Sequence, residues 1–410
     1  MTSPEGTTDT PDSAVRRGSP WLMLALATVG FAVNFWAWAL LSPLGPKFRA
    51  SGQLGQLSES DVALLVAVPV LVGSLGRIPV GALTDRFGGR VMFPLVSAMS
   101  IVPVLFLAFF ALDSYALILF GGFFLGISGT VFAVGVPFVN AWFPPEKRGT
   151  ATGIFGAGMG GTAISALTTV HIWDGAGHRA PFLITAVVLA AYAVAAWLLM
   201  RDAPGRTVVT TPMLTRIRAN VGLPITWQAG ILYAVSFGGY VAFSVYLPAY
   251  LITAHDLTAS DASTRMAGFV VVAVVMRTVG GVLCDRFEAV TVLAVCFALT
   301  TVCAAVAATN PPMDVRGTTA FLLMAAALGA GSGATFGLIA QTTDPAKVGG
   351  VTGLVGAAGG LGGFVPPLLM GYIYGRTDSY MLGLLLLAIT AALTLVLTLT
   401  VVRRTAGGAS

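Results

Sequence analysis

Long apolar stretches alternate with short polar stretches along almost the whole chain. About 20 apolar residues form a helix long enough to cross the hydrocarbon core of a bilayer. Twelve stretches meet this requirement, near residues 20–44, 61–83, 91–111, 115–141, 150–170, 180–200, 226–252, 264–284, 289–308, 317–341, 348–374 and 379–402. The pattern predicts an all-α membrane protein with twelve transmembrane helices.

The polar stretch at residues 201–225 is the longest inside the chain, and it separates six apolar stretches from six others. We interpret it as a linker between two halves. The predicted organisation is a disordered tail at 1–19, a six-helix bundle at 20–200, the linker at 201–225, a second six-helix bundle at 226–402 and a short tail at 403–410.

The two halves repeat each other at an offset of 200 residues. Arg77 stands eight residues before an Asp-Arg-Phe sequence, and Arg277 stands eight residues before a second one. The sequence TGIFGA at 152–157 likewise has a counterpart, TGLVGA, at 352–357. Six helices per half is an even number, so both copies have the same orientation in the membrane. Two parallel six-helix pseudo-repeats favour a transporter in which the bundles rock against each other.

The composition excludes a soluble multi-domain protein. Hydrophobic residues make up 56% of the 410 residues and charged residues only 10%, against about 25% charged residues in soluble proteins. A mean hydropathy of +0.87 is incompatible with a water-exposed surface, which needs polar cover. Twelve membrane helices also leave no room for a separate soluble domain.

The distribution of Lys and Arg predicts the orientation. With the N-terminus inside the cell, the tails, the linker and the inside loops hold 14 of the 22 basic residues, and the outside loops hold six. This bias satisfies the positive-inside rule and places the linker and both termini in the cytoplasm of a multi-pass protein of the cell membrane. The net charge of +5 then follows from topology, and no nucleic-acid partner is expected.

The two remaining basic residues, Arg77 and Arg277, fall in the middle of predicted spans. Each is eight residues from the Asp at the end of its span, or about 12 Å of helix. A guanidinium there costs at least ~2.5 kcal/mol unless it faces water or a partner. A structural arginine paired with a carboxylate is the alternative, but every Asp and Glu lies in a tail, a loop or a span end. The pair therefore predicts a site for a small anion, and planar guanidinium groups match nitrate, nitrite or carboxylate.

The absence of acids inside the spans also bears on coupling. Proton-coupled transporters usually carry the proton on Asp, Glu or His within the membrane, whereas His171, His178 and His255 lie at or near predicted outside connections. Two close arginines repel each other until an anion binds, which favours exchange of one anion for another. The alternative is a proton that travels on water or with the substrate.

The sequence GALTDRFGGR at 81–90 resembles the loop motif G-x-L-x-D-R-x-G-R of the major facilitator superfamily, with the last basic residue displaced by one. A degenerate copy, GVLCDRF, stands at 281–287. An ordinary charged turn is the alternative, but two copies at equal distance from an arginine argue against it. The resemblance implies the major facilitator fold and a conformational lock formed by Gly81, Asp85, Arg86, Arg90, Asp285 and Arg286.

Further motifs are similar to those of the nitrate/nitrite porter family within this superfamily. They are FAVNFWAWA at 31–39, GISGTVF at 126–132, GTATGIFGAGMGGT at 149–162 and the segment from GGVTG at 349–353 through GGFVP at 362–366. The resemblance implies that Arg77 and Arg277 bind the anion. It also implies substrate contacts for Phe132 and for Tyr233, with Tyr240 as the alternative to Tyr233.

The two glycine-rich segments supply the predicted signature and gating residues, Gly153, Gly156, Gly158, Met159, Gly353, Gly356 and Gly360. Small residues at this spacing let helices approach closely, so we favour packing and sliding over direct ligand binding for the glycines. The family commonly has Asn where this chain has Met159, and a thioether cannot donate a hydrogen bond. This departure leaves the identity of the anion open; Asn34 and Asn140 are other candidate donors.

These features predict a secondary active transporter of nitrate and nitrite, with antiport as the preferred mechanism. Proton-coupled nitrate symport, transport of another small anion such as a carboxylate, and a sensor of transporter fold are the alternatives. The sequence contains no Cys/His cluster, Ser/His/Asp arrangement, HExxH or phosphate-binding G-x-x-x-x-G-K-[ST], so we expect neither an enzyme nor an ATP-driven pump. We expect no metal and no cofactor, a monomer, and small inorganic anions and membrane lipid as partners.

Overall fold

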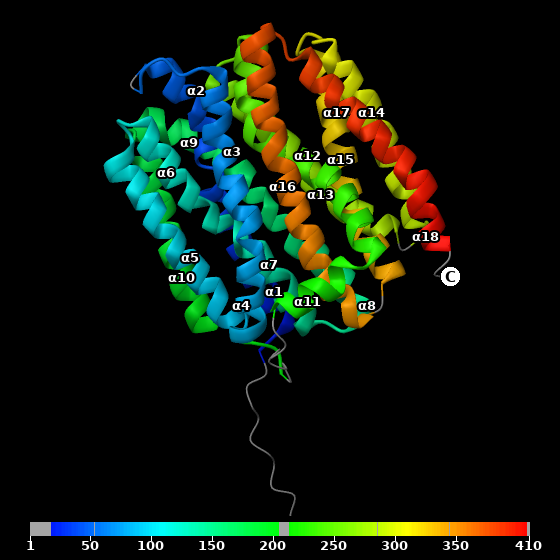
Figure 1. Cartoon of the computed structure of the whole chain (residues 1–410). Helices are drawn as coiled ribbons and strands as arrows, with labels where there is room; N and C mark the ends of the chain where they lie inside the picture. The colour runs from blue at the N-terminus through cyan, green and yellow to red at the C-terminus, as the bar shows by residue number, and fades with distance from the viewer. Residues whose placement is uncertain (1–17, 53, 205–212, 285, 344, 408–410) are drawn as a thin grey trace, which may run out of the picture.

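The computed structural model describes residues 18–52, 54–204, 213–284, 286–343 and 345–407, and every regular element in these ranges is a helix (Figure 1). Within these ranges, twelve helical stretches are long and apolar enough to cross a membrane, which confirms the predicted number. They are Pro20–Ser51, Glu59–Phe87, Gly89–Ala111, Tyr115–Trp142, Thr150–Ala176, Ala180–Leu199, Pro224–His255, Ala259–Leu283, Ala289–Ala308, Val315–Thr342, Gly350–Thr377 and Met381–Ala406.

The first bundle consists of α1 (Pro20–Trp38), α2 (Leu41–Ser51), α3 (Glu59–Leu75), α4 (Arg77–Phe87), α5 (Gly89–Phe106), η1 (Leu107–Ala111), α6 (Tyr115–Leu125), η2 (Gly126–Thr130), α7 (Val131–Trp142), α8 (Pro145–Gly156), η3 (Ala157–Gly160), α9 (Gly161–Ala176) and α10 (Ala180–Leu199). The linker contains α11 (Met213–Val221). The second bundle consists of α12 (Pro224–His255), α13 (Ala259–Leu283), α14 (Ala289–Ala308), α15 (Val315–Thr342), α16 (Pro345–Thr377), α17 (Met381–Leu397), η4 (Thr398–Val402) and α18 (Arg403–Gly407).

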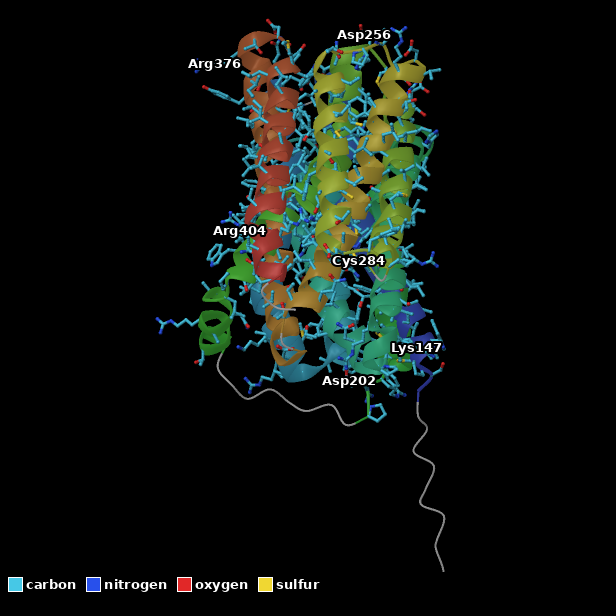
Figure 2. All side chains as sticks on the ribbon, turned by 90° about the vertical axis from the view of Figure 1, so that its right-hand side faces the viewer. Lys147, Asp202, Asp256, Cys284, Arg376 and Arg404 are labelled. Atoms are coloured by element: carbon cyan, nitrogen blue, oxygen red, sulfur yellow. The ribbon has the colours of Figure 1, made fainter. Side chains whose placement is uncertain are left out.

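The two bundles stand side by side and meet along a few helices (Figure 1). α3 of the first bundle packs against α16 of the second, and α9 packs against α13. Asp256 and Arg376 lie at one end of the molecule, whereas Lys147 and Asp202 lie at the other (Figure 2). Because the number of spans is even, α1 begins and α18 ends toward the side of Lys147 and Asp202. We call this side the termini end and the other side the opposite end.

The first bundle is less regular than the second. Its spans of α6–α7 and α8–α9 each contain a 3₁₀ turn, η2 and η3, whereas α15 and α16 of the second bundle are continuous. Both turns lie in glycine-rich sequence, where the absence of side chains permits tighter winding. Gly76, directly before Arg77, separates α3 from α4. Irregular backbone of the first bundle therefore lies next to the predicted anion site.

Several helices extend beyond the predicted apolar ranges. The first span continues from residue 44 to Ser51, so Lys47 and Arg49 lie on a helix and not in the expected loop. α11 forms inside the linker, and helical structure continues to Gly407, within the expected C-terminal tail. An apolar pattern detects only the part of a helix that lies in lipid. A helix can continue past that part, because long basic side chains on it reach water. Of the expected N-terminal tail, residues 1–17 lie outside the described residues.

Large apolar side chains are exposed in both bundles, for example Val102, Phe110, Val187 and Leu393. Soluble proteins rarely expose apolar surface on this scale. Together with the twelve apolar helices, this surface identifies a multi-pass membrane protein.

Candidate anion-binding site

Arg77 and Arg277 lie close to the same two aromatic rings. Arg77 is the first residue of α4, Arg277 lies in α13, and each is 5% exposed. The Cζ atom of Arg77 is 5.2 Å from the ring centroid of Phe132 and 5.6 Å from that of Phe237. The Cζ atom of Arg277 is 5.9 Å and 5.5 Å from the same two centroids. The fold thus brings the two charges together from opposite bundles.

Arg77 is held by backbone carbonyl groups. Its Nη1 donates a hydrogen bond to the carbonyl oxygen of Gly356 in the other bundle, at 2.9 Å, and its Nε donates to that of Gly129, at 3.4 Å. Gly129 belongs to the 3₁₀ turn η2, and Gly356 belongs to α16. Neither acceptor carries a formal charge, so the positive charge of Arg77 stays uncompensated.

Arg277 is held by side-chain hydroxyl groups. Its Nη1 donates to the hydroxyl oxygen of Tyr233 at 3.1 Å and to that of Ser332 at 3.3 Å. The alternative aromatic, Tyr240, instead pairs its hydroxyl with that of Thr162, at 3.2 Å. Of the two candidate tyrosines, Tyr233 is therefore the one that accepts a hydrogen bond from Arg277. In the described part of the chain, the ion pairs with carboxylates involve neither Arg77 nor Arg277.

Phe237 is a member of this cluster that the sequence analysis missed. Its ring stacks on Tyr233, with centroids 4.7 Å apart and planes 3° apart. It also faces Phe132 at 6.3 Å with an interplanar angle of 26°. Phe237 follows Tyr233 by four residues, which is one turn of α12 and the same helix face. This spacing is the signal that could have identified it.

Three of the predicted signature glycines lie against an arginine of the opposite bundle. A Cβ atom on Gly156 would be 3.3 Å from Nε of Arg277, and one on Gly360 would be 3.2 Å from Nη1 of Arg77. Gly356 offers its carbonyl to Arg77, and a Cβ atom there would be 3.5 Å from Phe132. These glycines make room for the guanidinium groups, which adds a direct role at the site to the expected packing role.

The other signature residues do not contact the arginines in this way. A Cβ atom on Gly153 would meet Thr278, and one on Gly158 would meet Phe31. A Cβ atom on Gly353 would meet nothing within 4 Å. Met159 is 1% exposed and belongs to the core of the molecule.

The two asparagines considered as extra donors face other groups. Asn34 donates to the carbonyl of Gly30 and to the hydroxyl of Ser97, and its Oδ1 has no hydrogen-bond partner. Asn140 accepts a hydrogen bond from Thr152 at 3.0 Å. Only Asn140 lines the cavity that leads to Arg77.

A cavity of about 190 Å³ connects the termini end with this site. Its wall includes Arg77 and Phe132 at one limit and Asp85, Asn140 and Asn220 at the other. The wall is formed by both bundles, because Gly353 and Gly356 of α16 complete it. Arg77 can therefore be reached from the termini end.

The residues of the predicted conformational lock gather at the mouth of this cavity. Gly81 and Asp85 line it, and Arg86 and Arg90 are exposed nearby, at the junction of α4 and α5. The backbone N–H of Arg90 donates to Oδ1 of Asp202 at 3.1 Å. In the second copy, Arg286 is exposed, and Asp285 lies outside the described residues. The role of these residues as a lock stays a prediction.

One acidic residue at the end of a span is buried. Glu59, the first residue of α3, is 6% exposed at the opposite end of the molecule. A charge-based reading of the sequence places it at a span end and cannot show which residues cover it. Its contacts are described below.

A sequence profile of the Major Facilitator Superfamily matches residues 27–262 and 229–410. Among solved structures, a bacterial homolog to the human lysosomal transporter Spinster, in an inward-facing and occupied conformation, is similar with a TM-score of 0.70. The match covers 95% of this chain and 97% of that one at 18% sequence identity, so it shows a shared fold. The inward-facing and unoccupied form of such a homolog gives a TM-score of 0.69.

Several relatives are similar over nearly their full length. A "Probable nitrate/nitrite transporter NarK2" of Mycobacterium tuberculosis is 47% identical over 370 residues, which cover 90% of this chain and 93% of that protein. A "Nitrite extrusion protein" of Bacillus subtilis is 33% identical, with 92% and 93% covered. A "Probable nitrate transporter NarT" of Staphylococcus haemolyticus is 31% identical, with 90% and 94% covered. The chain therefore belongs to the major facilitator superfamily and, within it, to the nitrate/nitrite porter family.

Proposed function

We propose that the protein is a secondary active transporter that carries nitrate and nitrite across the cell membrane and exchanges one for the other by alternating access. The observation that carries the proposal is the pair Arg77 and Arg277, buried, converging and without a carboxylate partner in the described chain. Two uncompensated guanidinium groups require an anion. The names of the relatives, which include nitrate/nitrite transporter and nitrite extrusion protein, support the choice of anion.

The aromatic rings favour a flat anion. Phe132 and Phe237 face each other with centroids 6.3 Å apart. A planar group in contact with both faces needs about 7 Å between them, because the optimal carbon–carbon separation is about 3.5 Å. If the two rings move apart by less than about 1 Å from their present distance, nitrate or nitrite fits between them. The guanidinium forks would then bind the oxygen atoms at the edge of the anion.

The charges favour exchange. One monovalent anion between two guanidinium groups leaves the site at +1, whereas the empty site carries +2. The hydrogen-bond partners of the arginines are carbonyl and hydroxyl groups, and none of them is a carboxylate that could take the place of the anion. The empty site resists closure by repulsion, and a bound anion relieves it. Return of the transporter then depends on the counter-anion.

The cavity and the positive-inside rule together suggest the state of the transporter. The cavity reaches Arg77 from the termini end. The excess of Lys and Arg at that end assigns it to the cytoplasm. The structure then corresponds to an inward-facing state, with the exit of the anion toward the cytoplasm open.

Uptake of nitrite into proteoliposomes tests the proposal directly. Vesicles are loaded with nitrate or with an inert anion, and uptake is followed with and without a proton gradient. Uptake that requires internal nitrate and ignores the gradient is expected. Uptake into nitrate-free vesicles driven by protons would replace exchange with symport. If neither anion moves but a small carboxylate does, the substrate assignment is wrong, and Met159 becomes the first residue to exchange for Asn.

A further inference from the structure

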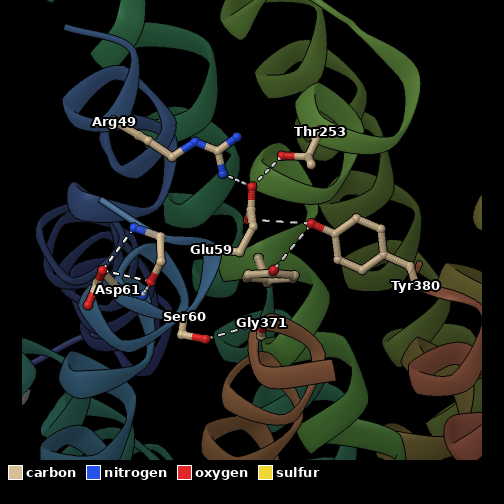
Figure 3. A network of polar contacts seen from close by, with 9 residues as sticks. Arg49, Glu59, Ser60, Asp61, Thr253, Gly371 and Tyr380 are labelled. Carbon is tan, nitrogen blue, oxygen red and sulfur yellow. Dashed lines mark hydrogen bonds and ion pairs between the residues drawn. The ribbon is translucent and has the colours of Figure 1, made fainter. Parts of the chain in front are cut away.

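A network of polar contacts joins the two bundles around the first residue of α3 (Figure 3). Its centre is the carboxylate of Glu59. Oε1 accepts a hydrogen bond from the hydroxyl of Thr253 at 2.7 Å, and Oε2 accepts one from the phenol of Tyr380 at 3.4 Å. Arg49 forms an ion pair with the same carboxylate. We call these four residues the Glu59 network.

The members of the network come from both bundles. Arg49 in α2 and Glu59 in α3 belong to the first bundle, whereas Thr253 in α12 and Tyr380 before α17 belong to the second. Both hydrogen bonds of Glu59 therefore cross the interface, and the ion pair does not. Burial raises the pKa of the Tyr380 phenol to about 12, so the phenol stays a donor at neutral pH.

Other contacts across the interface surround this network. The hydroxyl of Ser60 donates to the carbonyl of Gly371 at 3.3 Å, and that of Ser42 donates to the carbonyl of Val245 at 2.6 Å. Each joins a neutral donor to a neutral carbonyl acceptor. Hydrogen bonds to a charged group are stronger than those between neutral groups. Glu59 is thus the charged acceptor among these cross-bundle contacts.

We propose that Glu59 is the residue that holds the outer end of the transport path closed. Opening this end requires α3 to separate from α12 and from Tyr380, which breaks both hydrogen bonds to the carboxylate. Arg49 moves together with Glu59, because both belong to the first bundle, and so the carboxylate keeps its counter-charge after separation. The Glu59 network can form and break repeatedly without leaving an isolated buried charge. The inference rests on the proposed alternating-access transport for its role, but its test needs no transport.

The sequence offers a matched control on the same helix turn. Asp61 follows Glu59 by two residues and accepts hydrogen bonds from the N–H and hydroxyl of Ser58, as part of the capping box of α3. The contacts of the Asp61 carboxylate stay within the first bundle. Asp61→Asn thus changes a carboxylate at the same helix end without touching the interface.

Cysteine labelling in intact cells measures the opening of this end. Ser42→Cys serves as the reporter, because Ser42 is 3% exposed at the interface with α12. A membrane-impermeant maleimide is added outside the cells, and the parent protein with its buried Cys284, Cys296 and Cys303 gives the background. We expect Glu59→Gln to label about tenfold faster or more, Thr253→Val and Tyr380→Phe to label faster by a smaller factor, and Asp61→Asn to label at the reporter's own rate.

The outcomes are distinct from those of the flux assay. Equal labelling of Glu59→Gln and Asp61→Asn would overturn the proposal, as would labelling of no variant from outside. The Thr253→Val and Tyr380→Phe variants leave the ion pair intact and keep the test valid if Glu59→Gln fails to fold. A protein that transports no nitrate would still give these labelling ratios. A wrong substrate assignment can therefore be told apart from a wrong role for the Glu59 network.

Discussion

Arg77 and Arg277 occupy equivalent positions in two repeats but are held in different ways. Arg77 donates to two backbone carbonyls, one of which belongs to the other bundle. Arg277 donates to the hydroxyls of Tyr233 and Ser332, both from its own bundle. Arg77 is thus part of the contact between the bundles, whereas Arg277 is fixed within one of them.

This difference follows from the backbone of each half. The first bundle has its 3₁₀ turn η2 beside Arg77, which leaves a carbonyl free to accept a hydrogen bond. In the second bundle, the hydroxyl of Ser332 in α15 takes the corresponding place beside Arg277. A sequence repeat therefore fixes where a charge lies but not what holds it.

Replacement of either arginine by lysine should have the largest effect. An ammonium group lacks the planar fork and the second donor set, so several charge-assisted hydrogen bonds of ~1.5–3 kcal/mol each are lost. We expect nitrate affinity, measured by titration calorimetry on the purified protein, to fall at least about 100-fold for Arg77→Lys and for Arg277→Lys. Arg265→Lys, at the far end of α13, is the control. Near-normal affinity in either site variant would remove that arginine from the site.

Addition of one methyl group at Gly360 should have the next largest effect. The new Cβ atom would be 2.2 Å from the hydroxyl of Ser74 and 3.2 Å from Nη1 of Arg77. Overpacking of this kind costs about 1–3 kcal/mol, and here it displaces the arginine. We expect Gly360→Ala to weaken nitrate binding about tenfold or more. Gly353→Ala, two turns earlier on α16 with nothing within 4 Å, should bind normally, and equal affinities would contradict the proposed crowding.

Replacement of Phe237 should have a moderate effect on nitrate affinity, because its ring lies near both arginines. Aromatic pairs contribute about 0.5–1.5 kcal/mol beyond their buried area, so Phe237→Leu should reduce nitrate affinity roughly two- to tenfold. The effect should be larger for flat nitrate than for a tetrahedral competitor anion. Phe243→Leu, on the same helix and packed against Phe269 and Phe321, is the control. A uniform loss for all anions would argue against stacking.

Removal of the Tyr233 hydroxyl should have the smallest effect on nitrate affinity, and this effect should come only from the lost hydrogen bond to Arg277. Tyr233→Phe removes a hydrogen bond of ~1 kcal/mol, or about a fivefold loss of affinity. Combined with Arg77→Lys the loss should be additive, whereas combined with Ser332→Ala it should not, because both hydroxyls bind Nη1 of Arg277. Tyr192→Phe, which removes another buried hydroxyl, controls for the substitution itself.

Much of the fold could be predicted from the sequence, because membrane helices are marked by length and hydropathy. The two arginines could also be identified, because their position in the spans leaves them without carboxylates. Phe132 and Tyr233 could be assigned only through resemblance, since most membrane aromatics simply pack. Structural contact with the arginines now supports both assignments, while their role in binding stays a proposal.

Other features of the site depend on contacts that carry no local signal. The carbonyl of Gly356 is a backbone atom, which every residue has, so its use as an acceptor for Arg77 cannot be predicted from residue type. The place of Glu59 at a span end does not show that it is buried, because one of the residues in contact with it is Tyr380, 321 residues away in sequence. Such burial depends on how two bundles meet and not on the pattern of either one.

The pairing of Arg49 with Glu59 has an electrical consequence. Transfer of one elementary charge across a membrane potential of 100 mV is worth about 2.3 kcal/mol, so a lock built on a single charge would respond to voltage. Arg49 and Glu59 carry opposite charges and belong to the same bundle. Their movement together displaces no net charge through the membrane field. The Arg49–Glu59 pair therefore adds no voltage dependence of its own to opening at this end.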